Sequence, residues 1–128
     1  MVGIVIVSHS KMVAEGTVEL AGQMAKENRL VACGGMEDGT IGTDAVRIMA
    51  AIEAANDGDG VAILADLGSG ILSAQTAIDL LESPIEVRIA DAPIVEGAIS
   101  AAMQASFGAS LDEVIDAAEI AREMSKID

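Results

Sequence analysis

The chain contains a single histidine, His9, which stands between Ser8 and Ser10 directly after a run of apolar residues. A neutral imidazole can attack a phosphoryl donor and carry the group as a covalent N–P intermediate. Apolar residues after position 10 recur at helical spacing, so the phosphate would lie beside a helix N-terminus, where free amides and the dipole favour negative charge. The two serine hydroxyls could donate further hydrogen bonds. A lone histidine is more often an ordinary surface residue, but this position favours a phosphate acceptor.

A carboxylate that could orient this imidazole is Asp66, which ends the apolar run 61–65. If that run is the strand beside the first one, the carboxylate can hold one ring nitrogen as N–H and leave the other free to attack. The alternative for Asp66 is a plain helix cap or turn residue. Two glycine-rich loops, 34–43 and 67–70, would flank the histidine with amides and hydroxyls. From these loops we expect phosphate contacts by Gly39, Thr40, Gly42, Thr43, Gly68 and Ser69.

Other chemistries fit these residues poorly. The sequence has no Walker A motif and no Gly-x-Gly-x-x-Gly fingerprint after the first strand, so nucleotide binding by this chain is not expected. One histidine and one cysteine cannot form the usual zinc cluster, and Asp57 and Asp59 lack the later ligands of a calcium loop, so we expect neither a metal nor a cofactor. A Ser69–His9–Asp66 hydrolase stays open, although the Gly-x-Ser-x-Gly elbow is missing and the shared loop makes such a relay awkward.

The composition narrows the class of partner. The net charge is −14, from 21 acidic and 7 basic residues, and the chain has one Phe and neither Tyr nor Trp. Such a chain would be repelled by nucleic acids and anionic membranes, so we expect proteins or small molecules as partners, and a basic patch on a protein partner would fit. No apolar run approaches the roughly 18 residues of a membrane span. The lone Cys33 fits a reducing cytoplasm and is interpreted as a small residue filling space at a strand end.

The periodicity of apolar residues predicts strands and helices in alternation, and His9 directly follows the first strand. Strands are expected at 2–8, 30–33, 61–65 and 85–89, and helices at 10–26, 44–56, from about 70 to 81, 94–105 and 111–124. Ser110 and Glu113 have the spacing of a capping box for the last helix. The whole chain, 1–128, is therefore expected to form one α/β domain. Its fold would be a doubly wound, four-stranded, mainly parallel sheet with helices on both faces and the site at the carboxyl ends of the strands.

Four motifs in order resemble a known family across nearly the whole chain. They are residues 5–10, 39–46, 66–69 and 92–97, and they are similar to the phosphotransfer subunit of the dihydroxyacetone kinase that depends on the phosphotransferase system (PTS). That subunit is related to the mannose-class EIIA domains. The resemblance implies a mannose-class EIIA-like fold and a single-domain phosphocarrier. Some family members carry fused HPr-like and enzyme I-like domains, and mannose-class relatives have an extra C-terminal strand where this chain is predicted to be helical.

The resemblance also implies a phosphoryl relay. His9 would accept phosphate from HPr, which enzyme I charges from phosphoenolpyruvate, and would pass it to ADP on the nucleotide-binding subunit of the kinase. A separate subunit binds dihydroxyacetone. Family members are typically homodimers, so we expect a cytoplasmic homodimer here. Two alternatives remain for the same site: a mannose-class EIIA that delivers phosphate to a sugar transporter, and a non-enzymatic module that senses a small anion.

Overall fold

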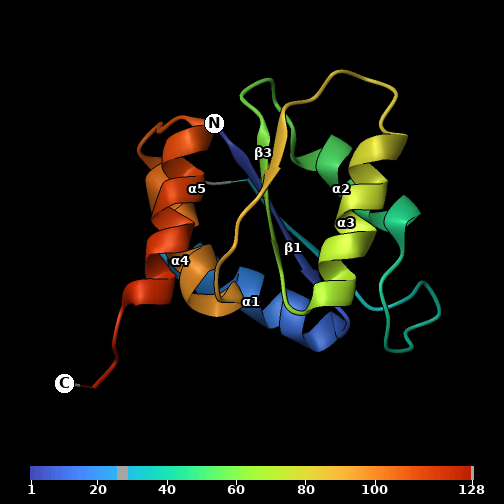
Figure 1. The fold of residues 1–128 in the computed structure, drawn as a ribbon, viewed down its shortest axis with the longest axis horizontal. Coiled ribbons are helices and arrows are strands. Elements are labelled where there is room, and N and C mark those ends of the chain that lie inside the picture. The colour runs from blue at the N-terminus through green and yellow to red at the C-terminus, as the bar shows by residue number, and fades with distance from the viewer. Residues whose placement is uncertain (26–28, 128) are drawn as a thin grey trace.

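The computed structural model describes residues 1–25 and 29–127, which form a single β-sheet with helices on both sides (Figure 1). The strands are β1 (Gly3–Ser8), β2 (Arg29–Gly34), β3 (Val61–Ala65) and β4 (Val87–Ile89), in the order β2-β1-β3-β4. The helices are α1 (Lys11–Met24), α2 (Ala45–Ala55), α3 (Gly68–Leu80), α4 (Ile94–Ser106) and α5 (Leu111–Ile120), followed by a 3-10 turn η1 (Ala121–Glu123). All described strand pairs are parallel, so the predicted doubly wound α/β class is confirmed.

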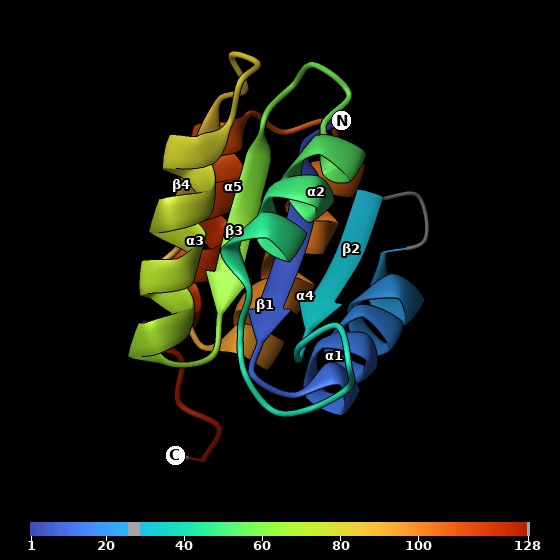
Figure 2. The same cartoon turned by 90° about the vertical axis from the view of Figure 1, so that its right-hand side faces the viewer.

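The helices form two layers with the sheet between them (Figures 1 and 2). On one face, α1 and α4 pack against Ile4 and Ile6 of β1, and α5 packs against β3, β4 and α4. On the other face, α2 and α3 pack against Val5 and Val7. Successive side chains of a strand point to opposite faces, so a strand covered on both sides needs an unbroken apolar run. That requirement explains the sequence of β1, in which all six residues are buried.

Small residues bring the helices close to the sheet. A Cβ at Gly34 would lie 2.5 Å from the Ser10 carbonyl oxygen, and a Cβ at Gly97 would lie 2.7 Å from the Leu64 side chain. Neither approach leaves room for a side chain. The close approach at Gly34 places the first turn of α1 against the end of β2, beside His9.

The predicted start of the third helix was wrong. The segment 67–70, expected as a tight loop, contains the first turn of α3, which begins at Gly68. The amides of Gly70 and Ile71 donate to the Leu67 carbonyl at 2.9 and 3.2 Å, so the helical bonding starts immediately after the strand. Gly68, Ser69 and Gly70 are therefore helical residues at the start of α3.

Two other boundaries also differ. The strand expected at 85–89 is confined to Val87–Ile89, because Pro84 has no N–H and the Ile85 amide turns back to the Ser83 carbonyl at 2.9 Å. The last helix tightens into the 3-10 turn after Ile120 instead of continuing to 124. The capping box at its start is confirmed. The first helix begins after its cap Ser10, and its predicted end at Lys26 lies outside the described residues. No described helix is long and apolar enough to cross a membrane.

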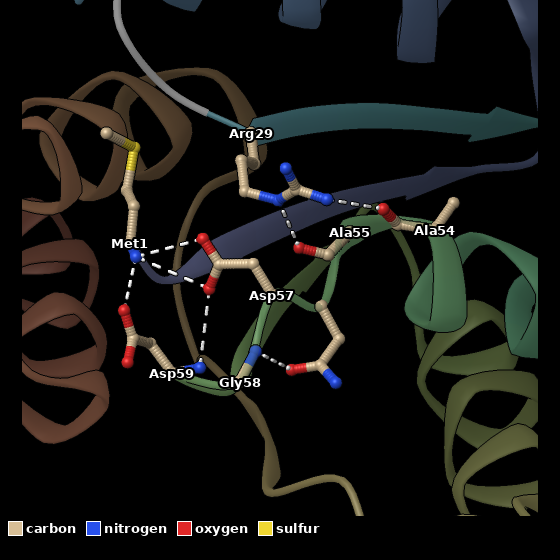
Figure 3. Close-up of polar contacts among 8 residues, drawn as sticks. Met1, Arg29, Ala54, Ala55, Asp57, Gly58 and Asp59 are labelled. Atoms are coloured by element: carbon tan, nitrogen blue, oxygen red, sulfur yellow. Dashed lines mark hydrogen bonds and ion pairs between the residues drawn. The ribbon is translucent and has the colours of Figure 1, made fainter.

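A polar cluster joins the elements at the amino edge of the sheet (Figure 3). The Met1 ammonium contacts the carboxylates of Asp57 and Asp59, which belong to the turn before β3. The Arg29 guanidinium donates to the carbonyls of Ala54 and Ala55 at 3.0 and 2.9 Å. A cation at these last carbonyls complements the C-terminus of α2. The cluster thus ties β1, β2 and α2 together at the edge of the sheet opposite His9.

Candidate active site

The site lies where the carboxyl ends of β1 and β3 meet. β1 is followed by His9 and β3 by Asp66, and the two strands are direct neighbours. The Asp66 amide continues the ladder by donating to the Val7 carbonyl at 3.1 Å. The chain leaves β1 toward β2 on one side and β3 lies on the other, so this is the switch point of the sheet, as the sequence predicted.

The Asp66 carboxylate accepts hydrogen bonds on both oxygens. Oδ2 accepts from the Ser8 hydroxyl at 2.8 Å and from the His9 amide at 3.0 Å. Oδ1 accepts from the Leu67 amide at 2.8 Å and lies 3.0 Å from Nδ1 of the imidazole. Burial opposes ionisation, but the His9 amide and the Ser8 hydroxyl outweigh it and hold the pKa of Asp66 below its ordinary value of 3.8. The side chain is therefore a carboxylate at neutral pH.

This carboxylate fixes the tautomer of His9. An ionised carboxylate can only accept hydrogen bonds, so Nδ1 must carry the hydrogen that points to Asp66. In the neutral ring Nε2 then holds the lone pair, and it lies 2.6 Å from the hydroxyl of Ser69, which donates to it. With 21% of its side chain exposed, the imidazole is firmly held and still open to a reactant. Of the two ring nitrogens, Nε2 is therefore the one whose lone pair is available for chemistry.

The two serines beside His9 build its surroundings. The buried Ser8 hydroxyl donates to Asp66 and accepts from the Ser10 amide at 3.0 Å, so both its functions are used in positioning. The Ser10 hydroxyl accepts from the Val13 amide at 3.3 Å and caps α1. Together they bind the first turn of α1 to Asp66.

The loop between β2 and α2 reaches the site at one point. The Gly42 amide donates to the His9 carbonyl at 3.0 Å, and the Thr43 hydroxyl shares a 2.7 Å hydrogen bond with Ser73 of α3. Gly39 and Thr40 make their hydrogen bonds inside the loop, the latter through its hydroxyl to Asp38 at 2.6 Å. Of the predicted phosphate-binding residues in this loop, the structure therefore brings Gly42 to His9 and directs Thr43 to α3.

Known proteins resemble this chain in sequence and in fold. The family model EIIA-man, described as the PTS system fructose IIA component, matches residues 3–115. The chain belongs to the EIIA-man family. Two relatives bear the name PEP-dependent dihydroxyacetone kinase, phosphoryl donor subunit DhaM. The one from Providencia stuartii is 45% identical over 125 residues, which cover 93% of this chain and 26% of that protein. The second, from Listeria innocua and numbered 2 in its name, is 37% identical over 118 residues, covering 90% and 94%.

This EIIA-man family member thus spans about a quarter of the Providencia protein and nearly all of the Listeria protein. The predicted resemblance to the phosphotransfer subunit is confirmed. A solved structure of a protein of unknown function matches with a TM-score of 0.82 and 33% identity, covering 93% of this chain and 94% of that one. The EIIA component of Streptococcus agalactiae matches with a TM-score of 0.68 and 16% identity over 100% and 97% of the chains, which shows the shared fold.

Two residues of this EIIA-man domain that sequence reasoning missed hold the loop. The guanidinium of Arg47 donates to the carbonyls of Gly34 and Gly35 at the end of β2. Ser73 lies one helical turn after Ser69 and holds Thr43. The spacing of four between the two serines would have revealed a shared helix face, had the helix been predicted to start at Gly68. No sequence signal distinguishes Arg47 from an ordinary surface cation of α2.

Three further features of this EIIA-man domain are a cavity beside Asp66, the distribution of possible metal ligands and the state of Cys33. A cavity of about 410 Å³ lies beside Asp66, lined on its other sides by Ile71 and Gln75 of α3 and by Asp91. Within residues 1–25 and 29–127, no three side chains of His, Cys, Asp or Glu gather as metal ligands. Cys33 is buried in β2, and burial raises the pKa of its thiol, which disfavours the reactive thiolate.

Proposed function

We propose that this chain is a phosphohistidine carrier. It takes a phosphoryl group from phospho-HPr on Nε2 of His9 and delivers it to ADP on the nucleotide-binding subunit of dihydroxyacetone kinase, as the phosphoryl donor component of that kinase. The observation that carries this proposal is the Asp66–His9 contact of 3.0 Å, which makes Nε2 the ring nitrogen that holds the lone pair. The names of the relatives support the choice of kinase. We further propose a single domain that works as a cytoplasmic homodimer.

The transfer proceeds by two displacements at phosphorus. The Nε2 lone pair of His9 attacks the phosphoryl group, the bond from phosphorus to the donor breaks, and the donor leaves with its electron pair. The ring becomes cationic, and the Asp66 carboxylate at Nδ1 stabilises that charge. In the second step an oxygen of the terminal phosphate of ADP attacks, the N–P bond breaks, and the imidazole returns to its neutral form.

The first turn of α3 is suited to receive the phosphate. The Ser69 hydroxyl, which donates to Nε2 in the free protein, can turn to donate to a phosphoryl oxygen. A Cβ at Gly68 would meet nothing within 4 Å, so this turn presents open backbone with helix N-terminal amides. Among the predicted phosphate-binding residues, we propose that Gly68 and Ser69 contact the phosphate and that Ser8, Ser10 and Gly42 position the histidine.

Incubation with phosphoenolpyruvate, enzyme I and HPr tests this function. The chain should acquire an acid-labile, base-stable phosphate, and His9→Ala should acquire none. Labelling of His9→Ala equal to the parent would refute the proposal. Transfer from the labelled chain to ADP on the kinase subunit supports the kinase assignment. Transfer to a sugar transporter domain would support the mannose-class alternative, and ligand stabilisation without labelling would indicate an anion sensor.

One observation favours a second candidate. We expected a Ser69–His9–Asp66 relay to be awkward, yet the first turn of α3 places Ser69 on the Nε2 side of the ring while Asp66 holds the Nδ1 side. Such an order also suits nucleophilic attack by a serine. A fluorophosphonate probe distinguishes the two functions. A hydrolase would form an adduct that is lost in Ser69→Ala, whereas a phosphocarrier would label only with the phospho-HPr system.

A further inference from the structure

A closed series of contacts begins at the backbone carbonyl of His9 and returns to Nε2 of its side chain. The His9 carbonyl accepts a hydrogen bond from the Gly42 amide at 3.0 Å. The next residue, Thr43, shares a hydroxyl hydrogen bond of 2.7 Å with Ser73. Ser73 is joined through one turn of α3 to Ser69, whose hydroxyl lies 2.6 Å from Nε2. Nε2 and the backbone carbonyl of His9 are thus connected twice, once through the side chain of His9 itself and once through Gly42, Thr43, Ser73 and Ser69.

Two bonds of this closed series are made by side chains: the contact between Ser69 and Nε2, and the hydrogen bond between Thr43 and Ser73. Gly42 lies at φ +149° and offers no side chain of its own, so its amide depends on its neighbours for position. Arg47 fastens the same loop, but at the end of β2 and not to α3. The hydroxyl pair therefore joins this loop directly to α3, the helix that carries Ser69.

We propose that Ser73 is a positioning residue for phosphoryl transfer at His9. It acts through Thr43 by keeping the Gly42 amide on the His9 carbonyl and the Ser69 hydroxyl beside Nε2. This role rests on the proposed phosphocarrier function. Small displacements of a reacting group cost large factors in rate, so the effect should appear in the transfer step and not in the encounter with the donor. Both hydroxyls are neutral at working pH, so the pH profile of transfer should keep its shape.

The main test compares single-turnover phosphorylation of the parent, Ser73→Ala, Ser73→Thr and Thr76→Ala by phospho-HPr. Thr76 is the matched control, because it lies on the same helix and its hydroxyl, among residues 1–25 and 29–127, bonds only to the Leu72 carbonyl of that helix, at 3.1 Å. We expect Ser73→Ala to lower the maximal rate about tenfold with an unchanged half-saturating donor concentration. Ser73→Thr keeps the hydroxyl and should restore most of the rate, and Thr76→Ala should match the parent.

Two further measurements make the outcome decisive. Amide hydrogen exchange at Gly42 should speed up in Ser73→Ala and not in Thr76→Ala, because the loop loses its anchor. In a double-mutant cycle with Thr43→Val, the effects of the two changes should not add, since they remove the same bond. A parent-like rate and parent-like Gly42 exchange in Ser73→Ala would overturn the proposal, as would fully additive effects. If the parent itself takes no label, the phosphocarrier function has failed, and the exchange data alone then decide whether Ser73 anchors the loop.

Discussion

The two edges of the sheet each hold a nitrogen group against carboxylates, and they do so in very different ways. At the carboxyl edge, Asp66 has 17% of its side chain exposed and receives two backbone amides and a hydroxyl besides the imidazole. At the amino edge, the carboxylates that contact the Met1 ammonium are 33% exposed at Asp57 and 61% exposed at Asp59 (Figure 3). The first cluster is built from strand ends, and the second from a terminus and a turn.

The difference separates a site from a surface contact. Exposed ion pairs gain little, because water screens them and two mobile groups lose freedom in forming them. Hydrogen bonds from backbone amides cost little further ordering, because the strands already fix the donors. Asp66 is therefore preorganised toward the imidazole, whereas the amino-edge cluster joins a chain terminus to more exposed carboxylates of a turn. A carboxylate near a nitrogen is not by itself a sign of function; the fixed geometry behind it is.

The sharpest test of this difference is the removal of one charge at each edge. Asp66→Asn should keep the fold but slow phosphoryl transfer about a hundredfold, because the amide no longer fixes the Nδ1–H tautomer or stabilises the cationic ring. Asp57→Asn, the matched change at the amino edge, should transfer at the parent rate. Single-turnover labelling by phospho-HPr measures both. Equal rates for Asp66→Asn and the parent would remove Asp66 from the mechanism.

Substitution of one glycine at each edge should give smaller effects, on the transfer rate at the carboxyl edge and on stability at the amino edge. Gly68→Leu adds a side chain where nothing lies within 4 Å, so the free energy of unfolding should hold while transfer slows about tenfold by obstruction of the phosphate. Gly58, in the amino-edge turn, has φ +111°, so Gly58→Ala should lower the free energy of unfolding by about 1 kcal/mol with no change in transfer.

Denaturant unfolding and transfer rates of the two glycine variants decide the matter. If Gly68→Leu lost stability and activity in the same proportion, Gly68 would be a structural residue and not part of an open phosphate site. If Gly58→Ala slowed transfer, the two edges would be coupled through the sheet.

One half of this contrast, the pairing of His9 with Asp66, could be predicted from the sequence. Unbroken apolar runs marked β1 and β3, and the residues that follow buried parallel strands meet at one edge, so His9 and Asp66 could be placed together. The contact of the Ser69 hydroxyl with Nε2 could be predicted only if α3 was known to begin at Gly68. The glycine-rich sequence of 67–70 indicated a loop instead. The Thr43–Ser73 bond could not be predicted, because it depends on how a loop of ten residues folds back on α3. The Arg47 contacts could not be predicted either, because they depend on how α2 returns to the end of β2. Local patterns do not encode these paths.

The smallest expected effect is a difference in pH dependence between the edges. Asp59 and then Asp57 raise the pKa of the Met1 ammonium above its ordinary 8.0, while the same ammonium lowers the pKa of Asp57 below 3.8. The stability from this cluster is present between those ordinary values. It is lost as pH rises through the raised value and as pH falls through the lowered one.

The Asp66 contribution should follow a one-sided course. Its donors include two amides and a hydroxyl, so it is present above pH 3.8, persists in mild alkali, and disappears as pH falls through the lowered pKa of Asp66. Urea unfolding of the parent against Asp66→Asn and against a double Asp57→Asn, Asp59→Asn variant, at pH 3, 6 and 10, measures both courses. In thermal unfolding at pH 6, the melting temperature of the double variant should differ from that of the parent by less than about 4 °C, and 1 M salt should erase that difference. A salt-resistant difference would mean that the amino edge is as preorganised as the site, and the contrast between the two edges would fail.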